Sequence, residues 1–359
     1  SDNIACSTLC ICQEDIAGLL KSFASVFSLV SAAGDYHSMN PGRPQVAAFG
    51  RKLYHLSHNP CMMPDHRSRR RSILQAASHR KAVSNGYYDE QMCLSAAKAY
   101  LSKLQSRRFS GIIFDYDDTL SEKAGDELIQ AEVWAQIDRL LTAGIRIGIA
   151  TGRGKSVRQE LQTHIDKRFW DAVAVGYYNG SCLASLADTS QPDKTLPVLP
   201  ELVYAKEIAD QINVNETVKI ELRPTQLTVT CDNGYALNCF VRLCKEKLHF
   251  YSSIKFVESK HSVDIISAAT QKTNTLKFFT KGKTAPGEFL FVGDSGYEGG
   301  NDFEMLCNSY SLSVDYVSST LDSCWNFAPL GTRNAAATLF YLEHTIVSKE
   351  THSFTVKLA

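Results

Sequence analysis

The pattern of apolar and polar positions predicts a regular alternation of strands and helices from about residue 109 onward. Gly111–Asp115 is a short apolar run typical of a buried strand. Asp126–Thr142 carries apolar residues at helical spacing, and Gly144 closes that helix. Ile145–Thr151 follows as a second strand. Because strand, helix and strand occur in this order, the pattern favours a parallel α/β sheet.

Over residues 188–266 the pattern of apolar and polar positions changes and predicts a small α+β unit. This stretch predicts two helices, at 200–212 and 235–248, and four strands, at 218–222, 227–231, 254–258 and 263–266. The earlier pattern then resumes with a helix after Lys272, a strand at 288–293 and a final helix at 334–346. We therefore predict a Rossmann-like core in two parts, residues 109–187 and 267–359, separated by an inserted unit, residues 188–266.

Residues 1–108 are expected to form a mainly helical extension of unknown role. Residues 14–30 predict one helix, and Asp89 is a candidate N-cap for another. A basic run extends from His66 to Lys81. It fits a solvated helix face or linker, and the alternative is a surface for a phosphate-rich partner, since arginine pairs well with phosphate oxygens.

Composition limits the classes of partner and compartment. Lys+Arg and Asp+Glu number 38 each, so no global field draws the chain toward nucleic acid or membrane. The 11 cysteines are odd in number and scattered, which favours reduced thiols and a cytoplasmic protein. A zinc site at Cys61 among neighbouring histidines lacks the CxxC spacing that would support it. The N-terminal apolar stretch is interrupted by polar residues, so neither a signal peptide nor a membrane span is expected.

Polar residues follow the predicted core strands. Asp115 and Asp117 come where the first strand ends, and Thr151 ends the second. Asp294 follows a later strand, and Lys272 opens a helix between them. Ligand sites form at the carboxyl ends of strands in open α/β sheets, and a nucleophile, a hydroxyl, a lysine and further acids are what phosphoryl transfer needs. A lone acidic pair would fit a solvated turn, but the hydrophobic strand before it and the other polar strand ends favour a site.

These residues resemble the four signatures of the haloacid dehalogenase (HAD) superfamily. Asp115-x-Asp117-x-Thr119 is similar to the first signature, Thr151 to the second, Lys272 to the third and Gly293-Asp294…Asn301-Asp302 to the fourth. The resemblance covers residues 109–346, and the insert with its preceding Tyr178-Asn-Gly180 turn resembles the C2B-capped subgroup. That subgroup includes Cof-type sugar phosphatases, sucrose-phosphate and trehalose-phosphate phosphatases and phosphomannomutases.

The chain departs from the family pattern at two places. Asp118 stands where the family usually has Gly, which adds a carboxylate beside the site. Residues 296–300 lengthen the fourth signature, so the roles of Asn301 and Asp302 are less secure than that of Asp294. Glu298 is a candidate replacement for either of them.

The resemblance implies a magnesium-dependent phosphatase that forms an aspartyl-phosphate. In that mechanism Asp115 is the nucleophile, and Asp117 is the general acid and base. Lys272 neutralises charge, and Mg²⁺ is held by Asp115, Asp294 and the backbone carbonyl of Asp117. The residues expected to bind substrate are Thr151, Gly152, Lys272 and Asn301, and those expected to support the site from behind are Asp118, Thr119 and Asp302.

Other functions fit the sequence less well. A P-loop nucleotide-binding protein would need Gly at position 149, which is Ile. A binding or scaffold protein on this core would be expected to lose an essential acid, yet all are present. A phosphomutase remains open because the same phosphorylated aspartate can pass its phosphate to a sugar. A phosphatase of nucleotides or nucleic-acid ends is suggested only by the basic run.

The substrate expected from the resemblance is a small phosphomonoester, favoured to be a phosphorylated sugar or polyol. Insert residues would select it, and the candidates for contacting a sugar are Tyr177, Tyr178, Arg223, Tyr235 and His261. The sequence gives no indication of the oligomeric state.

Overall fold

The structure is a computed structural model that describes residues 66–85, 89–122, 125–193, 195–213, 218–258, 262–280 and 288–358. These residues belong to one compact unit, His66–Ala359. The predicted helix at 14–30, the cysteine and histidine residues around Cys61, and His261 lie outside the described residues. Among the helices that are described, none combines the length and the apolar character that crossing a membrane would require.

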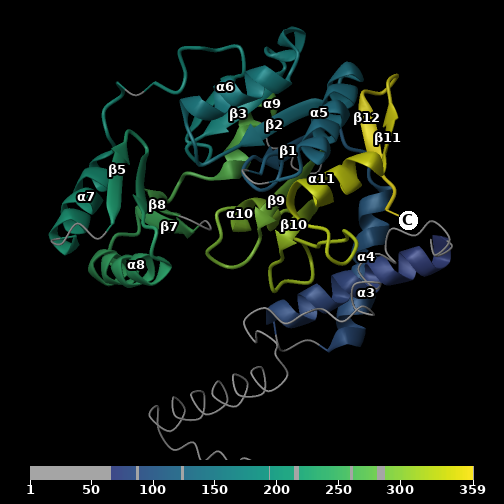
Figure 1. The fold of residues 1–359 in the computed structure, drawn as a ribbon, viewed down its shortest axis with the longest axis horizontal. Helices are drawn as coiled ribbons and strands as arrows, with labels where there is room; N and C mark the ends of the chain where they lie inside the picture. Colours follow the sequence, from purple (N-terminus) through teal and green to yellow (C-terminus); the bar gives the residue numbers. More distant parts are fainter. Residues whose placement is uncertain are drawn as a thin grey trace, which may run out of the picture. The chain divides into compact units, whose positions relative to one another are not determined.

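The core is a six-stranded sheet in the order β10-β9-β1-β2-β3-β4 (Figure 1). Neighbouring strands are parallel except for the β3–β4 pair. The strands are β1 (Gly111–Asp115), β2 (Arg146–Ala150), β3 (Val173–Tyr177), β4 (Cys182–Ser185), β9 (Phe289–Ser295) and β10 (Ser311–Tyr316). The predicted parallel α/β core is therefore confirmed.

The register of this sheet brings the polar strand ends to one edge. Asp115 is paired with Ala150, so Thr151 follows directly beyond it on the next strand. On the other side of β1, Phe114 is paired with Val292, which places Asp294 just past the level of Asp115. Because β1, β2 and β9 run parallel, their carboxyl ends all face the same way.

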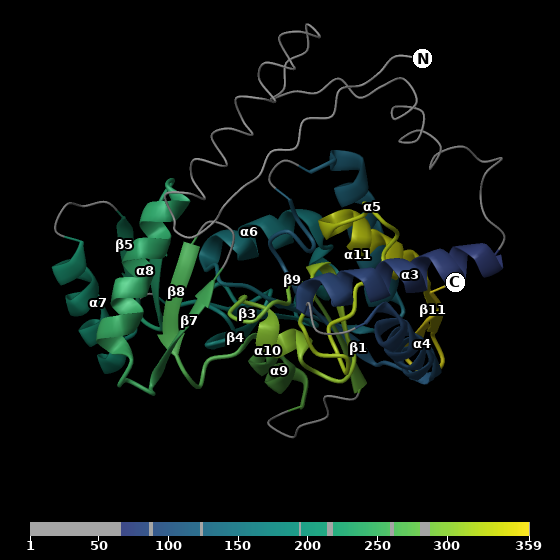
Figure 2. The same cartoon turned by 90° about the horizontal axis from the view of Figure 1, so that it is seen from below.

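Two layers of apolar side chains cover the two faces of the core sheet, as alternation along a strand requires. Ile112 and Phe114 belong to a cluster with residues of α4 (Glu90–Ser106), α5 (Glu127–Thr142), α6 (Lys155–His164) and α11 (Asn334–Glu343). Ile113 belongs to the opposite cluster, with residues of η3 (Lys272–Leu276) and α10 (Phe303–Leu306). Figure 2 shows the same elements from a second direction.

The insert is a four-stranded antiparallel sheet in the order β5-β6-β8-β7. Its strands are β5 (Lys219–Arg223), β6 (Gln226–Thr230), β7 (Ile254–Glu258) and β8 (Ser262–Ser267). Two helices, α7 (Pro200–Ile212) and α8 (Gly234–Leu248), contribute to an apolar core that is separate from the core-sheet clusters. All six predicted elements of this stretch are present within a few residues of the expected bounds.

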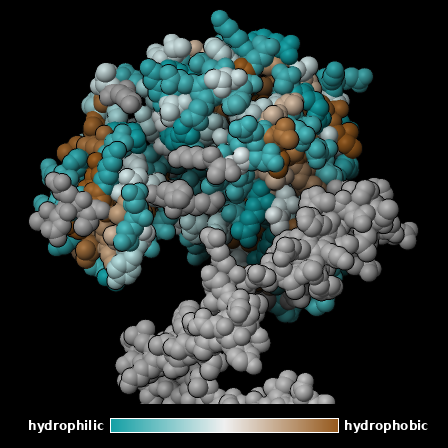
Figure 3. All heavy atoms as spheres, in the orientation of Figure 1, coloured by the Kyte–Doolittle hydropathy of each residue, from teal (hydrophilic) through white to brown (hydrophobic). Residues whose placement is uncertain are grey.

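Several apolar side chains of the insert remain at the surface. Val203 of α7 is 42% exposed, and Phe250, just after α8, is 84% exposed. In the space-filling view, apolar residues gather at the left, at the end of the molecule where Figure 1 labels α7 and α8 (Figure 3).

The basic run forms α3 (His66–Asn85), which packs against α4. Lys81 is fully buried, and its ammonium group donates to the carbonyls of Ser318, Thr320 and Ser323 at 2.6–2.9 Å. Arg80 donates to the carbonyls of Asn326, Ala328 and Pro329 in the same way. At these two positions the prediction of a solvated face or linker is wrong, because both cations hold the chain that follows β10.

Elements missed by the sequence pattern lie mainly at the margins. The short strands β4 and β10 were not predicted. The final helix ends at Glu343 rather than residue 346, and a hairpin follows, formed by β11 (Thr345–Ser348) and β12 (Ser353–Val356). The helix expected after Lys272 begins as the 3₁₀ helix η3 and continues as the single-turn helix α9 (Lys277–Thr280).

Candidate active site

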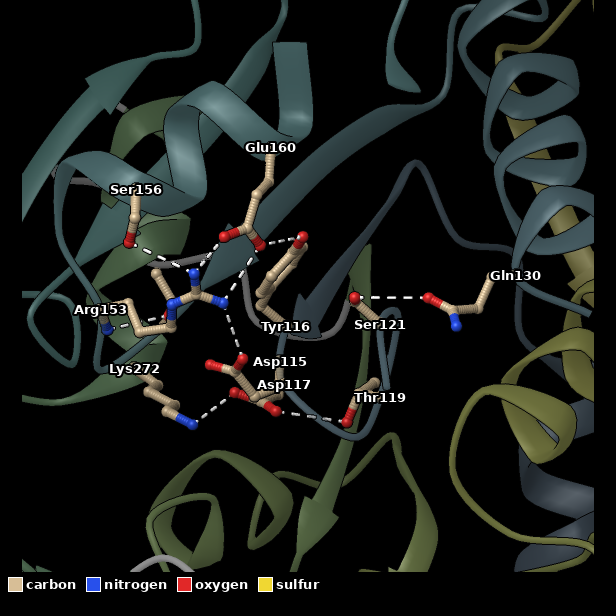
Figure 4. A network of polar contacts seen from close by, with 11 residues as sticks. Asp115, Tyr116, Asp117, Thr119, Ser121, Gln130, Arg153, Ser156, Glu160 and Lys272 are labelled. Atoms are coloured by element: carbon tan, nitrogen blue, oxygen red, sulfur yellow. Dashed lines mark hydrogen bonds and ion pairs between the residues drawn. The ribbon is translucent and has the colours of Figure 1, made fainter. Parts of the chain in front are cut away.

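Asp115 and Lys272 form a buried ion pair at the carboxyl end of β1. The Lys272 Nζ atom lies 2.5 Å from Asp115 Oδ1 and 2.6 Å from Asp302 Oδ1. Both partners of the first pair are at most 3% exposed in their side chains. The Thr119 hydroxyl donates to the other oxygen of Asp115 at 3.3 Å. Figure 4 shows Lys272 and Thr119 pointing at Asp115 from opposite sides.

Three carboxylates converge at this point. Asp115, Asp294 and Asp302 are all buried, and one oxygen of each lies within 4.8 Å of the others. Asp302 also accepts hydrogen bonds from the backbone N–H groups of Asp294 and Ser295, at 2.9 and 3.2 Å. Asp302 can come this close to the backbone of β9 only because residue 293 is Gly: a Cβ at this position would lie 2.6 Å from Asp302 Oδ2. Asp302, which was expected only to support the site from behind, is therefore a member of the acidic cluster.

Burial and mutual repulsion make this cluster unfavourable as three free carboxylates. Burial, together with the charge of Asp302, raises the pKa of Asp115 to about 8. The same two causes raise the pKa of Asp294 to about 9. Burial lowers the pKa of Lys272, but Asp115 and Asp302 outweigh this and raise it above its usual value. A single ammonium does not balance three acids, so the donor set fits a small divalent cation with a preference for oxygen ligands.

Asp117 points away from this cluster toward an arginine. Its Oδ1 atom lies 3.0 Å from Arg153 Nη1. Arg153 also pairs with both oxygens of Glu160, one of them at 3.1 Å, and Tyr116 donates its hydroxyl to Glu160 at 2.9 Å. Figure 4 shows these side chains as one chain of contacts above Asp115. Asp117 is 48% exposed in its side chain, so it lies where solvent or a substrate can reach it.

Thr151 directly follows β2 and is completely buried. Its hydroxyl accepts from the Arg153 N–H at 3.0 Å, which shapes the loop of Gly152 and Arg153. Helix α6 begins after Gly154 with no side-chain cap, so Thr151 does not serve as its N-cap. Gly148 and Ile149, the position where the P-loop alternative needs a glycine, both lie inside β2.

The two departures from the family pattern have structural explanations. Asp118 has φ 57°, a left-handed conformation that Gly adopts freely and Asp tolerates better than most residues. The longer fourth signature reaches the insert: Glu258 N–H donates to Gly299 O at 2.9 Å, and Asn301 N–H donates to Glu258 O at 3.0 Å. Glu258 at the end of β7 thus pairs with this loop. Glu298 is exposed and does not enter the acidic cluster.

A second polar cluster, which sequence reasoning missed, joins the insert to the core. The Asn179 amide donates to Gln226 Oε1 at 3.1 Å and to Asp264 Oδ2 at 3.3 Å. Gln226 in turn donates to the Gly152 carbonyl at 3.1 Å. Asn179, Gln226 and Asp264 are 2%, 1% and 8% exposed. The Tyr178-Asn-Gly180 turn was the one sequence signal for this contact; Gln226 and Asp264 lie on strands whose polar positions gave none.

The sugar-contact candidates are not brought together as a group. Tyr177 and Tyr178 are both buried, and Arg223 lies over the Tyr178 ring with its guanidinium carbon 5.7 Å from the ring centroid. Tyr235 is 80% exposed at the start of α8. The Asn301 side chain, expected to bind substrate, has a buried oxygen without a protein partner.

Comparison with known proteins gives structural likeness only. No family model matches the chain, and no curated protein matches it. Among solved structures, a truncated, IMP-bound IMP-nucleotidase of Plasmodium falciparum is 15% identical, covers 68% of this chain and 76% of that chain, and has a TM-score of 0.46. The C-terminal domain of a C. albicans trehalose-6-phosphate phosphatase is 14% identical, with 68% and 94% covered and a TM-score of 0.46.

A third similar structure is the sucrose-phosphatase of Synechocystis sp. PCC6803, in complex with sucrose and phosphate. It is 18% identical, covers 66% of this chain and 98% of that chain, and has a TM-score of 0.45. At TM-scores below 0.5, these likenesses leave the function to be judged from the site of the chain itself.

Proposed function

We propose that the chain is a Mg²⁺-dependent phosphomonoester hydrolase that works through a phosphorylated Asp115. The observation that carries this proposal is the buried cluster in which Lys272 bridges Asp115 and Asp302 beside Asp294. Burying three acids is costly unless cations compensate them, and a stable fold keeps such a cluster only for a strong reason. Binding a phosphate together with a divalent ion supplies that reason.

Asp115 is held as the nucleophile would need to be. Lys272 and Thr119 each contact one of its oxygens, which fixes the plane of the carboxylate. In the first step a carboxylate oxygen of Asp115 forms a bond to phosphorus, and the ester bond from phosphorus to the leaving oxygen breaks. In the second step a water oxygen bonds to phosphorus, the bond to Asp115 breaks, and inorganic phosphate leaves.

Asp117 is assigned the proton transfers. It gives its proton to the leaving oxygen in the first step and takes one from the attacking water in the second. Arg153, Glu160 and Tyr116 orient it through the contacts described above. Asp117 is two residues beyond Asp115 and less buried, so it can face both the leaving group and incoming water.

The residues that would hold Mg²⁺ are Asp115, Asp294 and Asp302, together with the backbone carbonyl of Asp117. When bound, the ion supplies charge neutralisation between the acids and the phosphoryl oxygens. Thr151, Gly152 and Lys272 would contact those oxygens from the neighbouring loop. The substrate class we favour is a phosphorylated sugar or a similar small metabolite.

The experiment is a phosphate-release screen across sugar phosphates, nucleoside monophosphates and end-phosphorylated oligonucleotides, with Mg²⁺ and with a chelator. Wild-type protein should release phosphate from at least one class only when Mg²⁺ is present. Asp115→Asn should lose more than about 10³-fold of that rate, since a nucleophile is removed from an interdependent site.

The matched control is Asp138→Asn, which changes an exposed acid of α5 that pairs with Arg168. It should retain full activity. If Asp115→Asn keeps more than a tenth of the wild-type rate while remaining folded, Asp115 is not the nucleophile and the proposal fails.

A further inference from the structure

The outer edge of the insert's sheet is paired with a loop of the core. Strand β7 comes last in the order β5-β6-β8-β7, so one side of its backbone has no neighbouring strand among the described parts of the insert. Glu258, its last residue, forms a parallel bridge with Gly300 of the lengthened fourth signature. The Glu258 N–H donates to Gly299 O at 2.9 Å, and its carbonyl accepts from Asn301 N–H at 3.0 Å. A free strand edge pairs readily with another backbone, and here the core supplies one.

Two glycines give the loop the shape that this contact needs. Gly299 has φ 89°, a left-handed conformation that residues with a side chain rarely adopt. A Cβ at Gly300 would lie 2.3 Å from the carbonyl oxygen of Ser295, which leaves no space for a larger residue. The chain can therefore meet β7 and turn back within a few residues, which brings it to Asp302.

Strand β7 also contacts the chain on the other side of Asp302. Lys255 forms an ion pair with Glu304, two residues beyond Asp302, and the Lys255 side chain is only 20% exposed. The backbone bonds of Glu258 thus hold the chain just before Asp302, and this ion pair holds the chain just after it. Asp302 itself belongs to the buried acidic cluster. One edge of the insert therefore fixes both flanks of a residue of that cluster.

We infer that the insert positions Asp302 through the edge of β7, so that divalent-ion binding and the contact between β7 and residues 299–304 strengthen each other. The inference rests on the ion site of the proposed function and goes beyond it, because it gives the insert a part in that site. Holding this segment against β7 orders Asp302 before the ion binds, and a ligand ordered in advance increases affinity. By thermodynamic linkage, the ion must favour the contact by the same factor.

A contact that only holds the insert in place would behave differently. Its loss would lower the stability of the protein equally with and without the ion, and the affinity for the ion would stay the same. A contact that positions Asp302 changes the affinity itself. The dissociation constant for Mg²⁺, measured by calorimetry without any substrate, therefore separates the two roles.

The first test compares the Kd for Mg²⁺ in Glu258→Pro and Glu258→Ala. Both substitutions remove the side chain and its pair with Lys245, but only proline removes the N–H that donates to Gly299. Because both backbone groups of Glu258 point to the loop, its pairing with Val263 of β8 loses no bond. We expect a Kd at least about threefold higher in Glu258→Pro than in Glu258→Ala, as the loss of one backbone hydrogen bond implies.

Lys255→Met tests the other flank of Asp302 without altering the backbone. Losing a cation would by itself increase the attraction for a divalent ion, so a Kd raised by about twofold or more indicates lost positioning. Lys219→Met is the matched control, since it changes an exposed lysine on β5, at the opposite edge of the same sheet, and should keep the wild-type Kd. Equal Kd values in the two Glu258 variants, with an unchanged or lower Kd in Lys255→Met, overturn the inference.

Hydrogen exchange of the backbone tests the linkage in the other direction. In wild-type protein, Mg²⁺ should slow the exchange of the Glu258 N–H relative to protein in chelator, because this group bonds to Gly299. Asp294→Asn, which removes a proposed ion ligand, should abolish the difference. Equal exchange with and without Mg²⁺ in wild-type protein overturns the coupling.

Failure of the proposed function gives a different pattern of results. Protein that binds Mg²⁺ but hydrolyses no phosphomonoester overturns the hydrolase, and the Kd comparison still decides the role of β7. Protein that hydrolyses a phosphomonoester with Mg²⁺ but shows equal Kd values keeps the hydrolase and loses the positioning role. Absence of Mg²⁺ binding in wild-type protein overturns both.

Discussion

Lys272 and Lys81 are both buried, at 3% and 0% exposure, yet they lie in opposite electrostatic surroundings. Lys272 contacts the carboxylates of Asp115 and Asp302, whose charges raise its pKa. Lys81 contacts only uncharged oxygens, those of the segment after β10, and burial lowers its pKa to about 8. A buried lysine thus belongs to an acid-rich cluster at position 272, whereas at position 81 it donates to backbone carbonyls.

The difference indicates what each lysine is for. Asp115, Asp294 and Asp302 beside Lys272 leave an excess of negative charge that a divalent cation can balance. The three carbonyls around Lys81 are neutral and need only hydrogen-bond donors, which its ammonium provides. Burial alone therefore does not mark a functional lysine, whereas burial beside uncompensated charge does.

For the two lysines, the largest expected effect is that of Lys272→Met on turnover. Under the proposed function, Lys272 orients Asp115 and neutralises the phosphoryl group, so its removal should lower kcat by about 10²–10³-fold. Steady-state phosphate release, on whichever compound the wild-type protein hydrolyses, measures this. Lys277→Met, an exposed position five residues along the same segment, should change kcat by less than twofold.

A small loss in Lys272→Met would break the comparison. If the variant retains more than a third of the wild-type kcat, the contact of Lys272 with Asp115 is structural. Lys272 would then have a structural role, as Lys81 does.

The next effect is that of Lys81→Met on stability. Three carbonyls, of Ser318, Thr320 and Ser323, would lose their donor inside the fold. We expect the free energy of unfolding to fall by about 2–4 kcal/mol, with kcat unchanged at a temperature where the variant is folded. Denaturant titration measures the first quantity, and Lys98→Met on the exposed side of α4 is the control. A loss of kcat without a loss of stability would contradict the structural role.

The contrast between these lysines also explains what the sequence could predict. Strand β1 and helix α5 follow from local periodicity, and the predicted N-cap Asp89 does cap α4 by accepting from the Met92 N–H. The acids at the strand ends were placed together because parallel strands bring their carboxyl ends to one edge. Lys272 was predicted from its order among the signatures, and its contact with Asp115 follows from the same topology.

What sequence reasoning missed depends on contacts between distant segments. Lys81 lies in a run of charged residues, and only the carbonyls more than 230 positions later make it a buried donor. Asp302 was expected to support the site from behind, because residues 296–300 lengthen its loop. The extra residues pair with Glu258, and Asp302 after them still contacts Lys272 in the cluster. Strand β10 was missed because its polar residues Ser311 and Ser313 are buried, and their backbone groups bond to distant tyrosines: Ser311 N–H donates to the Tyr100 hydroxyl, and the Tyr341 hydroxyl donates to the Ser313 carbonyl.

The smallest effect is a pH dependence that separates the two lysines by titration. The unfolded chain keeps the Lys81 proton up to about its ordinary value of 10.5, whereas the folded chain releases it near 8. Between these values the unfolded state binds more protons, so the free energy of unfolding rises with pH. Lys272, with its raised pKa, keeps its proton over the same window and contributes no such slope.

Comparison of wild-type protein with Lys81→Met isolates this contribution, because the other titrating groups are common to both. The difference in their free energies of unfolding should widen by about 1–2 kcal/mol from pH 7.5 to 9.5. A neutral amine has only two hydrogens for three carbonyls, which places the expected value toward the lower end. A flat difference would mean that burial does not lower the pKa of Lys81, and titration would then not separate Lys81 from Lys272.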